Sequence, residues 1–285
     1  MNIYQMIAEK MPMMSKSQKK LATYILENTN TVPFYTVATL SKRAGVSEAS
    51  VVRFAVFLGF SGYRELQSEM QQSVQKQLTT RERIKISSQV YDDSNQGIYD
   101  IFKDDIANIR STMENLDTKA LLDAVDLLLK GKEIYITANR SSVSLGMFLE
   151  YYLDIILGNT HLLGPVEIKP EELHRLNEKD VVIGISFARY SMSTVNMMSY
   201  AKELNATTIA ITDNLRSPLI PHADVVLTAS SQLPTFFDSY VAPLSLINTL
   251  ITFVGQKRME ESEERLEKLE DIWDRFGTFY SDEGE

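Results

Sequence analysis

The chain has 285 residues, no cysteine and an apolar content of 44%, which suffices for two domains with separate hydrophobic cores. The lack of cysteine excludes disulfides, cysteine-rich zinc modules and a thiol nucleophile, and it fits the reducing cytoplasm. The first 14 residues lack the basic start and apolar core of a secretory signal. The most apolar late stretch, residues 241–255, contains Pro243 and several polar residues, so we expect a buried helix and no membrane span.

The formal net charge of −9 is unevenly distributed along the chain. Up to Val90 there are 12 lysines and arginines against 6 acidic residues, whereas the remainder carries 17 basic against 32 acidic residues. This asymmetry predicts a polyanion-binding module joined to an acidic body. Chance clustering is an equally good account of the charges taken alone.

The first part of the chain has only helical patterns. A helix begins after Ser15, and three more are predicted at 36–44, at 47–58 and from Ser61 onward. We therefore assign residues 1–75 to an all-α domain. The stretch after it is rich in Gln, Ser, Thr and charged residues, so residues 76–97 are predicted to be a linker.

Residues 98–285 have a different pattern, in which short apolar runs alternate with helical stripes. This alternation is typical of a parallel sheet that helices cover on both faces. The predicted fold class is α/β, with an all-α N-terminal domain followed by a doubly wound parallel sheet and a long C-terminal helix over 238–276. The predicted strands are 133–137, 160–163, 181–186, 207–212 and 224–228.

The helices predicted at 36–44 and 47–58 have the spacing of a helix-turn-helix. In this motif a glycine turn joins two helices, and apolar residues at fixed offsets hold the two helices at a steep angle. The sequence supplies Gly45 at the turn. The expected inward positions are Leu40, Ala44, Val46, Val51, Phe54 and Leu58. An ordinary helical hairpin with solvated charges would share the glycine and the stripe, but not the basic charge balance.

The opposite face of the second helix is small and polar, which lets a recognition helix approach base edges in the major groove. Ser47 is expected to cap this helix, and Arg53 is the strongest candidate for a base or phosphate contact. The predicted DNA-binding residues are Lys42, Arg43, Ser47, Glu48, Ala49, Ser50, Arg53 and Arg64. Of these, Lys42, Arg43 and Arg64 are expected to clamp the phosphate backbone.

The run AGVSEASVVRF over residues 44–54, continued by LGFSGYREL over residues 58–66, resembles the N-terminal domain of the RpiR/MurR family of transcription regulators. The resemblance implies that a sugar isomerase (SIS) domain follows the DNA-binding domain.

Two loops of the second part have the form of an anion site, because each follows a predicted strand and leads into a helix N-terminus. Each combines an arginine with hydroxyl groups, which together bind carboxylate or phosphate. The predicted ligand-binding residues are Asn139, Arg140, Ser141, Ser142, Ser186, Arg189, Tyr190 and Ser191. The alternative is that Ser141 and Ser191 are simple helix caps and the arginines are surface charges.

Residues 186–191, 210–213, 217–219, 223–227 and 238–248 are similar to the SIS domain of the same family. The resemblance implies a dimeric domain that binds phosphosugars or related carbohydrate derivatives and thereby alters the affinity for DNA. Glycines typical of the family are missing from both loops, at Thr137, Asn139 and Arg189. Asn139 adopts a left-handed backbone more readily than most residues, and the two arginines supply charge. The loops therefore favour an anion without specifying a phosphosugar.

No catalytic or metal-binding residue is predicted, and no cofactor is expected. The three histidines are scattered, and His174 is the one catalytic candidate that would merit a test, although a surface role suits it better. The sequence has no Walker loop, no HExxH and no dinucleotide fingerprint.

Together these features predict a cytoplasmic homodimer or homotetramer that binds a double-stranded DNA operator and senses a small anionic metabolite. Two alternatives stay open. One is a sugar-phosphate isomerase with an accessory helical domain, and the other is a metabolite-binding adaptor that contacts proteins and no DNA.

Overall fold

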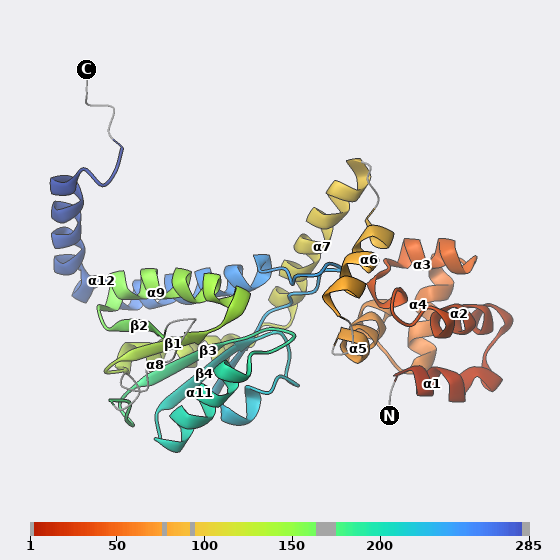
Figure 1. Ribbon diagram of the computed structural model, residues 1–285, viewed down its shortest axis with the longest axis horizontal. Coiled ribbons are helices and arrows are strands. Elements are labelled where there is room, and N and C mark those ends of the chain that lie inside the picture. Colours follow the sequence, from red (N-terminus) through yellow and green to blue (C-terminus); the bar gives the residue numbers. More distant parts are fainter. Residues whose placement is uncertain (1–2, 76–78, 92–94, 164–174, 281–285) are drawn as a thin grey trace. The chain divides into compact units, whose positions relative to one another are not determined.

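A computed structural model describes residues 3–75, 79–91, 95–163 and 175–280 (Figure 1). The chain divides into two compact units. The helical unit comprises Met1–Asp104 together with Gln232–Asp238, and the sheet unit comprises Asp105–Ser231 together with Ser239–Glu285. The chain therefore returns to the helical unit late in its sequence, through a short segment that precedes the last helix.

The helical unit packs its helices around one apolar core. The core contains side chains at helical spacing, among them Leu21, Leu40, Val51, Phe54 and Leu66, all with 0% exposure. Side-chain caps begin several of the helices, as at Ser15 for α2 and Thr36 for α3. The helices are α1 (Ile3–Lys10), α2 (Lys16–Glu27), α3 (Val37–Ala44), α4 (Glu48–Leu58), α5 (Tyr63–Gln75) and α6 (Thr80–Val90).

Helix α6 lies within the range 76–97, which the sequence predicts as a linker. A capping box begins it, in which the Thr79 hydroxyl accepts from the backbone of Glu82 and the Glu82 carboxylate accepts from the backbone of Thr79. Its side chains Arg83 and Ile86 are each 4% exposed. The polar composition of this range therefore predicted a linker where the chain forms a helix that buries Arg83 and Ile86.

The sheet unit is built on five parallel strands in the order β2-β1-β3-β4-β5, which confirms the predicted α/β fold class. All five residues of β1 and of β3 are buried, as expected for strands covered on both faces. The strands are β1 (Ile134–Ala138), β2 (Thr160–Leu163), β3 (Val181–Ile185), β4 (Thr207–Thr212) and β5 (Val225–Thr228).

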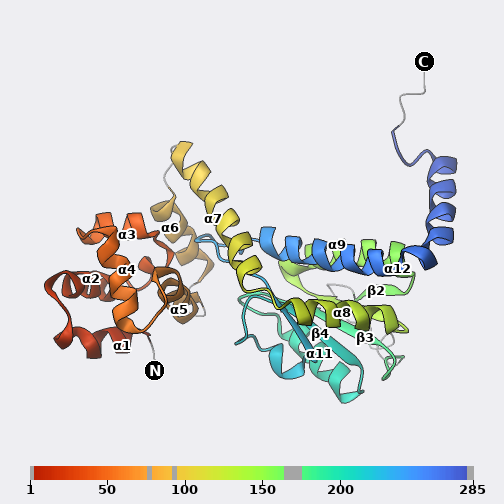
Figure 2. The same ribbon diagram turned by 180° about the vertical axis from the view of Figure 1, so that it is seen from behind.

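Helices cover both faces of this sheet, because alternate residues of each strand enter different cores. On one face, α8 (Thr118–Lys130), α9 (Val143–Leu157) and α12 (Val241–Phe276) contribute to a core with Ile136 and Ile183. On the other face, α11 (Met192–Glu203) packs Met197 and Met198 with Val182. Figure 2 shows α8, α9 and α12 from behind. The chain order reverses between β1 and β3, where such sheets bind ligands at the carboxyl ends of the strands.

Two helices are long, and one of them, α7 (Asn95–Glu114), contributes residues to both units. Helix α7 precedes α8, and α12 extends over 36 residues. Lys257 of α12 donates to Asp126 of α8 (2.6 Å), so the C-terminal helix is also tied to its neighbours by polar contacts. Within the described residues, no helix is both long enough and apolar enough to span a bilayer.

Candidate functional site

The turn between α3 and α4 has the geometry of a helix-turn-helix. Gly45 ends α3 with a left-handed backbone (φ +61°), and the Val46 N–H donates to the Ser41 carbonyl (3.0 Å). A Cβ atom at Gly45 would stand 2.7 Å from Nζ of Lys20, which donates to the Gly45 carbonyl (3.0 Å). The left-handed backbone favours glycine here, and a side chain would also displace the flexible end of Lys20.

The side chains predicted to lie inward from this turn do so. Leu40, Val51 and Phe54 have 0% exposure, Ala44 and Leu58 have 3%, and Val46 is half-buried. These contacts hold α3 and α4 together with α2 and leave the other face of α4 uncovered by its own unit.

The residues predicted to contact DNA lie at the surface of the helical unit, on α3, at the start of α4 and on α5. Ser50 is half-buried, and the other predicted residues are exposed, namely Lys42, Arg43, Ser47, Glu48, Ala49, Arg53 and Arg64. Ser47 caps α4 as predicted, because its hydroxyl accepts from the Ser50 N–H (3.3 Å). The Ser47 and Ser50 hydroxyls are 2.9 Å apart, and the Arg53 guanidinium donates weakly to Ser50 (3.4 Å). Serine hydroxyls and one arginine therefore line the first turns of the recognition helix.

Arg43 is held in place by an aromatic ring. Its guanidinium lies 4.9 Å from the centre of the Tyr35 ring, a cation–π contact. The Tyr35 carbonyl accepts hydrogen bonds from Tyr63 (2.8 Å) and Gln67 (3.0 Å) of α5. The contact positions Arg43 at the end of α3 and restricts the conformations of its side chain.

The two predicted anion loops lie side by side, because they follow neighbouring parallel strands. Ala138 at the end of β1 pairs with Ile185 at the end of β3. Both arginines have left-handed backbones, with φ +57° at Arg140 and φ +64° at Arg189. A left-handed backbone costs a residue other than glycine roughly 1–2 kcal/mol. Both arginines follow the carboxyl ends of paired strands, and both have a backbone that costs stability. This indicates that the loop conformations serve a function and not the stability of the fold.

The left-handed position of the first loop is not the one that the sequence suggests. Asn139 is extended (φ −129°), and Arg140 adopts the left-handed backbone instead. The Asn139 amide donates to the Thr194 hydroxyl at the start of α11 (3.0 Å), and Thr194 is fully buried. Asn139 therefore ties the first loop to the start of α11, the helix that follows the second loop.

The serines that precede α9 and α11 bond to other partners and do not cap these helices. Ser191 precedes α11 but makes no side-chain cap, and its N–H donates to the Ser186 hydroxyl (3.1 Å). Ser142 likewise precedes α9 without a side-chain cap. The Ser141 and Ser142 hydroxyls lie 2.8 Å and 3.2 Å from the hydroxyl of Tyr240. Ser191 and Ser142 therefore do not cap helices through their side chains, whereas Arg140 and Arg189 are exposed, as the alternative expects.

Tyr190 faces the neighbouring strand β4. Its hydroxyl donates to the Asp213 carboxylate (2.7 Å) and accepts from the Asn214 amide (3.2 Å). Burial raises the pKa of the Asp213 carboxyl above its usual range, and the Tyr190 hydrogen bond opposes this effect. Burial also raises the pKa of Tyr190. The Asp213 carboxyl group is thus hydrogen-bonded to Tyr190 of the second loop.

Sequence reasoning missed Thr194, Asp213 and Tyr240. Asp213 and Asn214 follow the carboxyl end of β4, and the rule for parallel sheets could have indicated them. Tyr240 lies within residues 238–248, which resemble the SIS domain, but it is 99 residues from Ser141, and the resemblance did not indicate its contact with the first loop.

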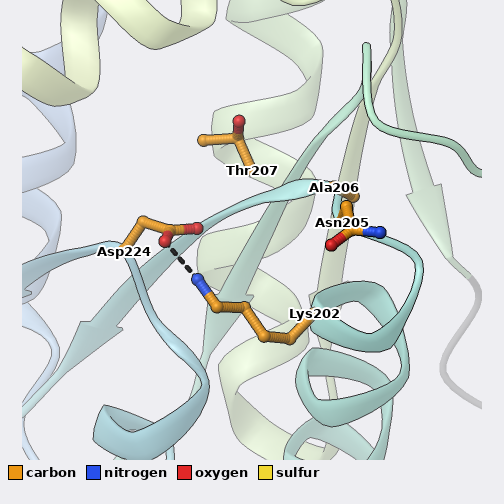
Figure 3. Close-up of a pocket in the computed structure, with 5 residues that line it drawn as sticks. All are labelled: Lys202, Asn205, Ala206, Thr207 and Asp224. Atoms are coloured by element: carbon orange, nitrogen blue, oxygen red, sulfur yellow. Dashed lines mark hydrogen bonds and ion pairs between the residues drawn. The ribbon is translucent and has the colours of Figure 1, made fainter.

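A separate cavity opens at the other end of the strands, where β4 begins (Figure 3). It is lined by Lys202, Asn205, Ala206, Thr207 and Asp224. Lys202 and Asp224 form an ion pair across it, and the Asp224 carboxylate also accepts from the backbone and hydroxyl of Thr208. These polar groups hold β4 and β5 in place, and none of the predicted site residues lines this cavity.

The remaining chemistry of the described residues is limited. His161 contacts the Glu133 carboxylate (2.8 Å), and His174 lies outside the described residues. No group of three or more His, Asp or Glu side chains in the described ranges could hold a metal ion.

Comparison with known proteins agrees with both units. Residues 1–77 match the helix-turn-helix domain of the rpiR family, and residues 127–253 match the SIS domain. The chain is 30% identical over 281 residues to a protein of Caldanaerobacter subterraneus subsp. tengcongensis, with 95% of this chain and 96% of that relative covered. That relative is named as an uncharacterized HTH-type transcriptional regulator.

Two solved structures share the fold. The sugar isomerase domain of an RpiR transcription factor from Sphaerobacter thermophilus is 24% identical and has a TM-score of 0.59, covering 61% of this chain and 98% of its own. The NanR protein of Vibrio vulnificus, solved with ManNAc-6P, is 18% identical and has a TM-score of 0.56, covering 96% of this chain and 99% of its own.

A helix-turn-helix unit and a parallel-sheet SIS unit in one chain define a two-part transcription regulator. The chain belongs to the RpiR family of helix-turn-helix transcription regulators, as its sequence motifs predict.

Proposed function

We propose that this protein is a cytoplasmic, homo-oligomeric transcription regulator that inserts α4 into the major groove of an operator. Its SIS domain senses a small anionic metabolite, a phosphosugar or a related compound, and the bound metabolite changes the affinity for DNA. The observation that carries the DNA-binding role is the outer edge of α4. Ser47, Ala49 and Arg53 are exposed there, while Val51 and Phe54 of the same helix are fully buried.

The anionic ligand is supported by the strained arginines. Arg140 and Arg189 keep left-handed backbones at the carboxyl ends of adjacent strands, and guanidinium groups bind phosphate and carboxylate through two parallel hydrogen bonds. The related NanR protein was solved with ManNAc-6P, which makes this sugar phosphate the first compound to test. Because Arg189 stands where the family has a glycine, we expect a ligand that this side chain contacts directly.

A regulatory role fits these residues better than catalysis does. Sugar isomerisation needs a base beside the substrate carbon, and the described part of the anion site offers Asp213, whose carboxyl is engaged by Tyr190. The relative from Caldanaerobacter is named as a regulator. Interconversion of aldose and ketose phosphates by the purified protein would contradict this part of the proposal.

Self-association is supported by an exposed apolar stripe on α7. Its members are large side chains that are 49–68% exposed, namely Ile98, Tyr99, Phe102, Ile106 and Met113. Such a stripe on a soluble protein marks an interaction surface. Two copies would present two recognition helices to a roughly palindromic operator, one helical turn of DNA or a multiple of it apart.

The DNA-binding role is tested with the full chain and genomic fragments. After an operator has been selected, Arg53→Ala should weaken binding by about 1–3 kcal/mol, because a base or phosphate contact is lost. Arg81→Ala is the matched control, since Arg81 is an exposed arginine of α6. Binding by the wild type that does not fall with rising salt, or equal affinities of Arg53→Ala and Arg81→Ala, would contradict the proposed interface.

The ligand is tested by calorimetry with ManNAc-6P and a panel of other sugar phosphates. Arg140→Ala and Arg189→Ala should each weaken the binding of the best compound by about tenfold or more, which is what loss of a charge-assisted hydrogen bond of 1.5–3 kcal/mol produces. Arg275→Ala, an exposed arginine near the end of α12, serves as the control. Unchanged affinity in both loop variants would place the ligand elsewhere.

A further inference from the structure

Three consecutive residues before α12 are each held by a different part of the chain. Asp238 accepts a hydrogen bond from Arg83 of α6 (2.7 Å), and the Ser239 hydroxyl donates to Asp105 of α7 (2.5 Å). The Tyr240 hydroxyl lies within hydrogen-bond distance of Ser141 and Ser142 in the first anion loop. Asp238 belongs to the helical unit, whereas Ser239 and Tyr240 belong to the sheet unit.

The anchor of this segment in the helical unit is strong. Arg83 is 4% exposed, and its guanidinium donates both to the Thr235 carbonyl (2.8 Å) and to the Asp238 carboxylate (2.7 Å). The Asp238 side chain is only 11% exposed. A buried arginine that has lost its partner is costly, so α6 and residues 235–238 are expected to move together.

The hydrogen bonds of Tyr240 to Ser141 and Ser142 depend on whether an anion occupies the site. Tyr240 has one hydroxyl proton, so its bonds to both Ser141 and Ser142 require that at least one serine donates to Tyr240. A phosphate or carboxylate bound to the two serines would accept the protons of both, because its unprotonated oxygens only accept hydrogen bonds. Tyr240 could then act only as a donor, and at least one of its two bonds would be lost. The Tyr240 ring also packs on Phe187 of the second loop, with 5.5 Å between the ring centres.

From this arrangement we infer that Tyr240 reports the occupancy of the anion site to the helical unit through the segment that ends at Asp238. The inference rests on the proposed anion site and names the residues that couple it to the DNA-reading unit. Only Ser239 lies between Tyr240, whose hydroxyl senses the anion, and Asp238, whose carboxylate Arg83 holds. A change in the hydrogen bonds of Tyr240 is therefore transmitted to α6 by the shortest covalent path that the chain provides.

The coupling is tested by hydrogen–deuterium exchange on the full-length protein, with inorganic phosphate as the probe and sodium chloride of equal ionic strength as the reference. In the wild type, phosphate should protect residues 139–142 and 186–191 and should change the exchange of residues 80–90 about fivefold, within the usual range of coupling between sites. In Tyr240→Phe, the loops should still be protected and the response of residues 80–90 should be lost. Tyr200→Phe, a 38% exposed tyrosine of α11, should behave like the wild type.

The outcomes separate the coupling from the proposed function. If phosphate fails to protect the loops of the wild type, the anion site itself is wrong, and the coupling is overturned with it. If the loops are protected but Tyr240→Phe keeps the response of residues 80–90, the coupling through Tyr240 is overturned while the anion site stands. Should Tyr240→Phe fold poorly, as judged by circular dichroism, Asp238→Asn provides the same comparison from the other end of the segment, and an unaltered response of residues 80–90 in it would equally overturn the coupling.

Discussion

At the scale of single residues, the turn of the DNA-reading unit depends on one glycine. The left-handed backbone of Gly45 is strained for any residue with a side chain, and a Cβ atom there would also displace the Lys20 ammonium. Gly45→Ala should therefore lower the free energy of unfolding by about 1–2 kcal/mol, as measured by urea denaturation of the full chain. Gly62→Ala is the matched control, because a Cβ there meets nothing within 4 Å, and it should change stability by less than about 0.5 kcal/mol. Equal losses in the two variants would contradict this account.

The buried Asp213 carboxyl predicts a pH dependence of stability. Because burial raises its pKa in the folded protein, the folded state binds the proton more tightly than the unfolded state does. The stabilisation from this group is complete below its unfolded pKa and is lost as the pH rises through its folded pKa. The unfolding free energy of the wild type minus that of Asp213→Asn should thus fall between acidic and neutral pH in urea titrations. A difference that rises over this range would show that the carboxyl is stabilised as the anion.

Single residues were also where sequence reasoning reached its limit. Gly45, Val51 and Phe54 were predictable, because helical spacing and turn chemistry fix their environments. The left-handed residue of the first anion loop was not, since Asn139 is the better candidate by propensity. Its hydrogen bond to Thr194, 55 residues later, decided the matter, and no local rule contains such a contact.

At the scale of elements, the C-terminal helix also stabilises its neighbour. Arg265 of α12 donates to the carbonyls of Asp154 (2.9 Å) and Ile155 (3.0 Å), which end helix α9. Arg265→Ala should destabilise the sheet unit by about 1 kcal/mol, because the last turn of α9 loses donors for its carbonyls. Thermal unfolding would measure this loss. Arg275→Ala on the same helix should have little effect, and a larger effect there would argue against the capping role.

Whole elements were predictable wherever their periodicity was regular. The strands at 133–137, 181–186 and 207–212 were expected from apolar runs and were found within one residue at each end. The long helix predicted at 238–276 runs from Val241 to Phe276. Helix α6 escaped notice, because its composition is polar and its buried arginine pairs with Asp238, 155 residues away.

At the scale of the whole molecule, the apolar stripe of α7 predicts self-association. Phe102 is 64% exposed on this stripe, and Phe102→Glu would place a charge in an apolar contact between copies. Sedimentation velocity should then show that the dissociation constant of the dimer rises by about tenfold or more. Lys103→Glu is the control, since it also adds negative charge but lies off the stripe, where it pairs with Asp100. A monomeric wild type, or equal effects of the two variants, would overturn the assignment of this surface.

The return of Gln232–Asp238 to the helical unit determines which fragments of this protein can fold as complete units. Cutting the chain once, anywhere between α6 and β1, would separate Arg83 from its hydrogen-bond partners Thr235 and Asp238. An isolated N-terminal piece would thus be destabilised for a reason unrelated to DNA. Gene fusions and proteolytic fragments of this regulator should therefore contain both Met1–Asp104 and Gln232–Asp238, because the helical unit is built from these two separate segments of the chain.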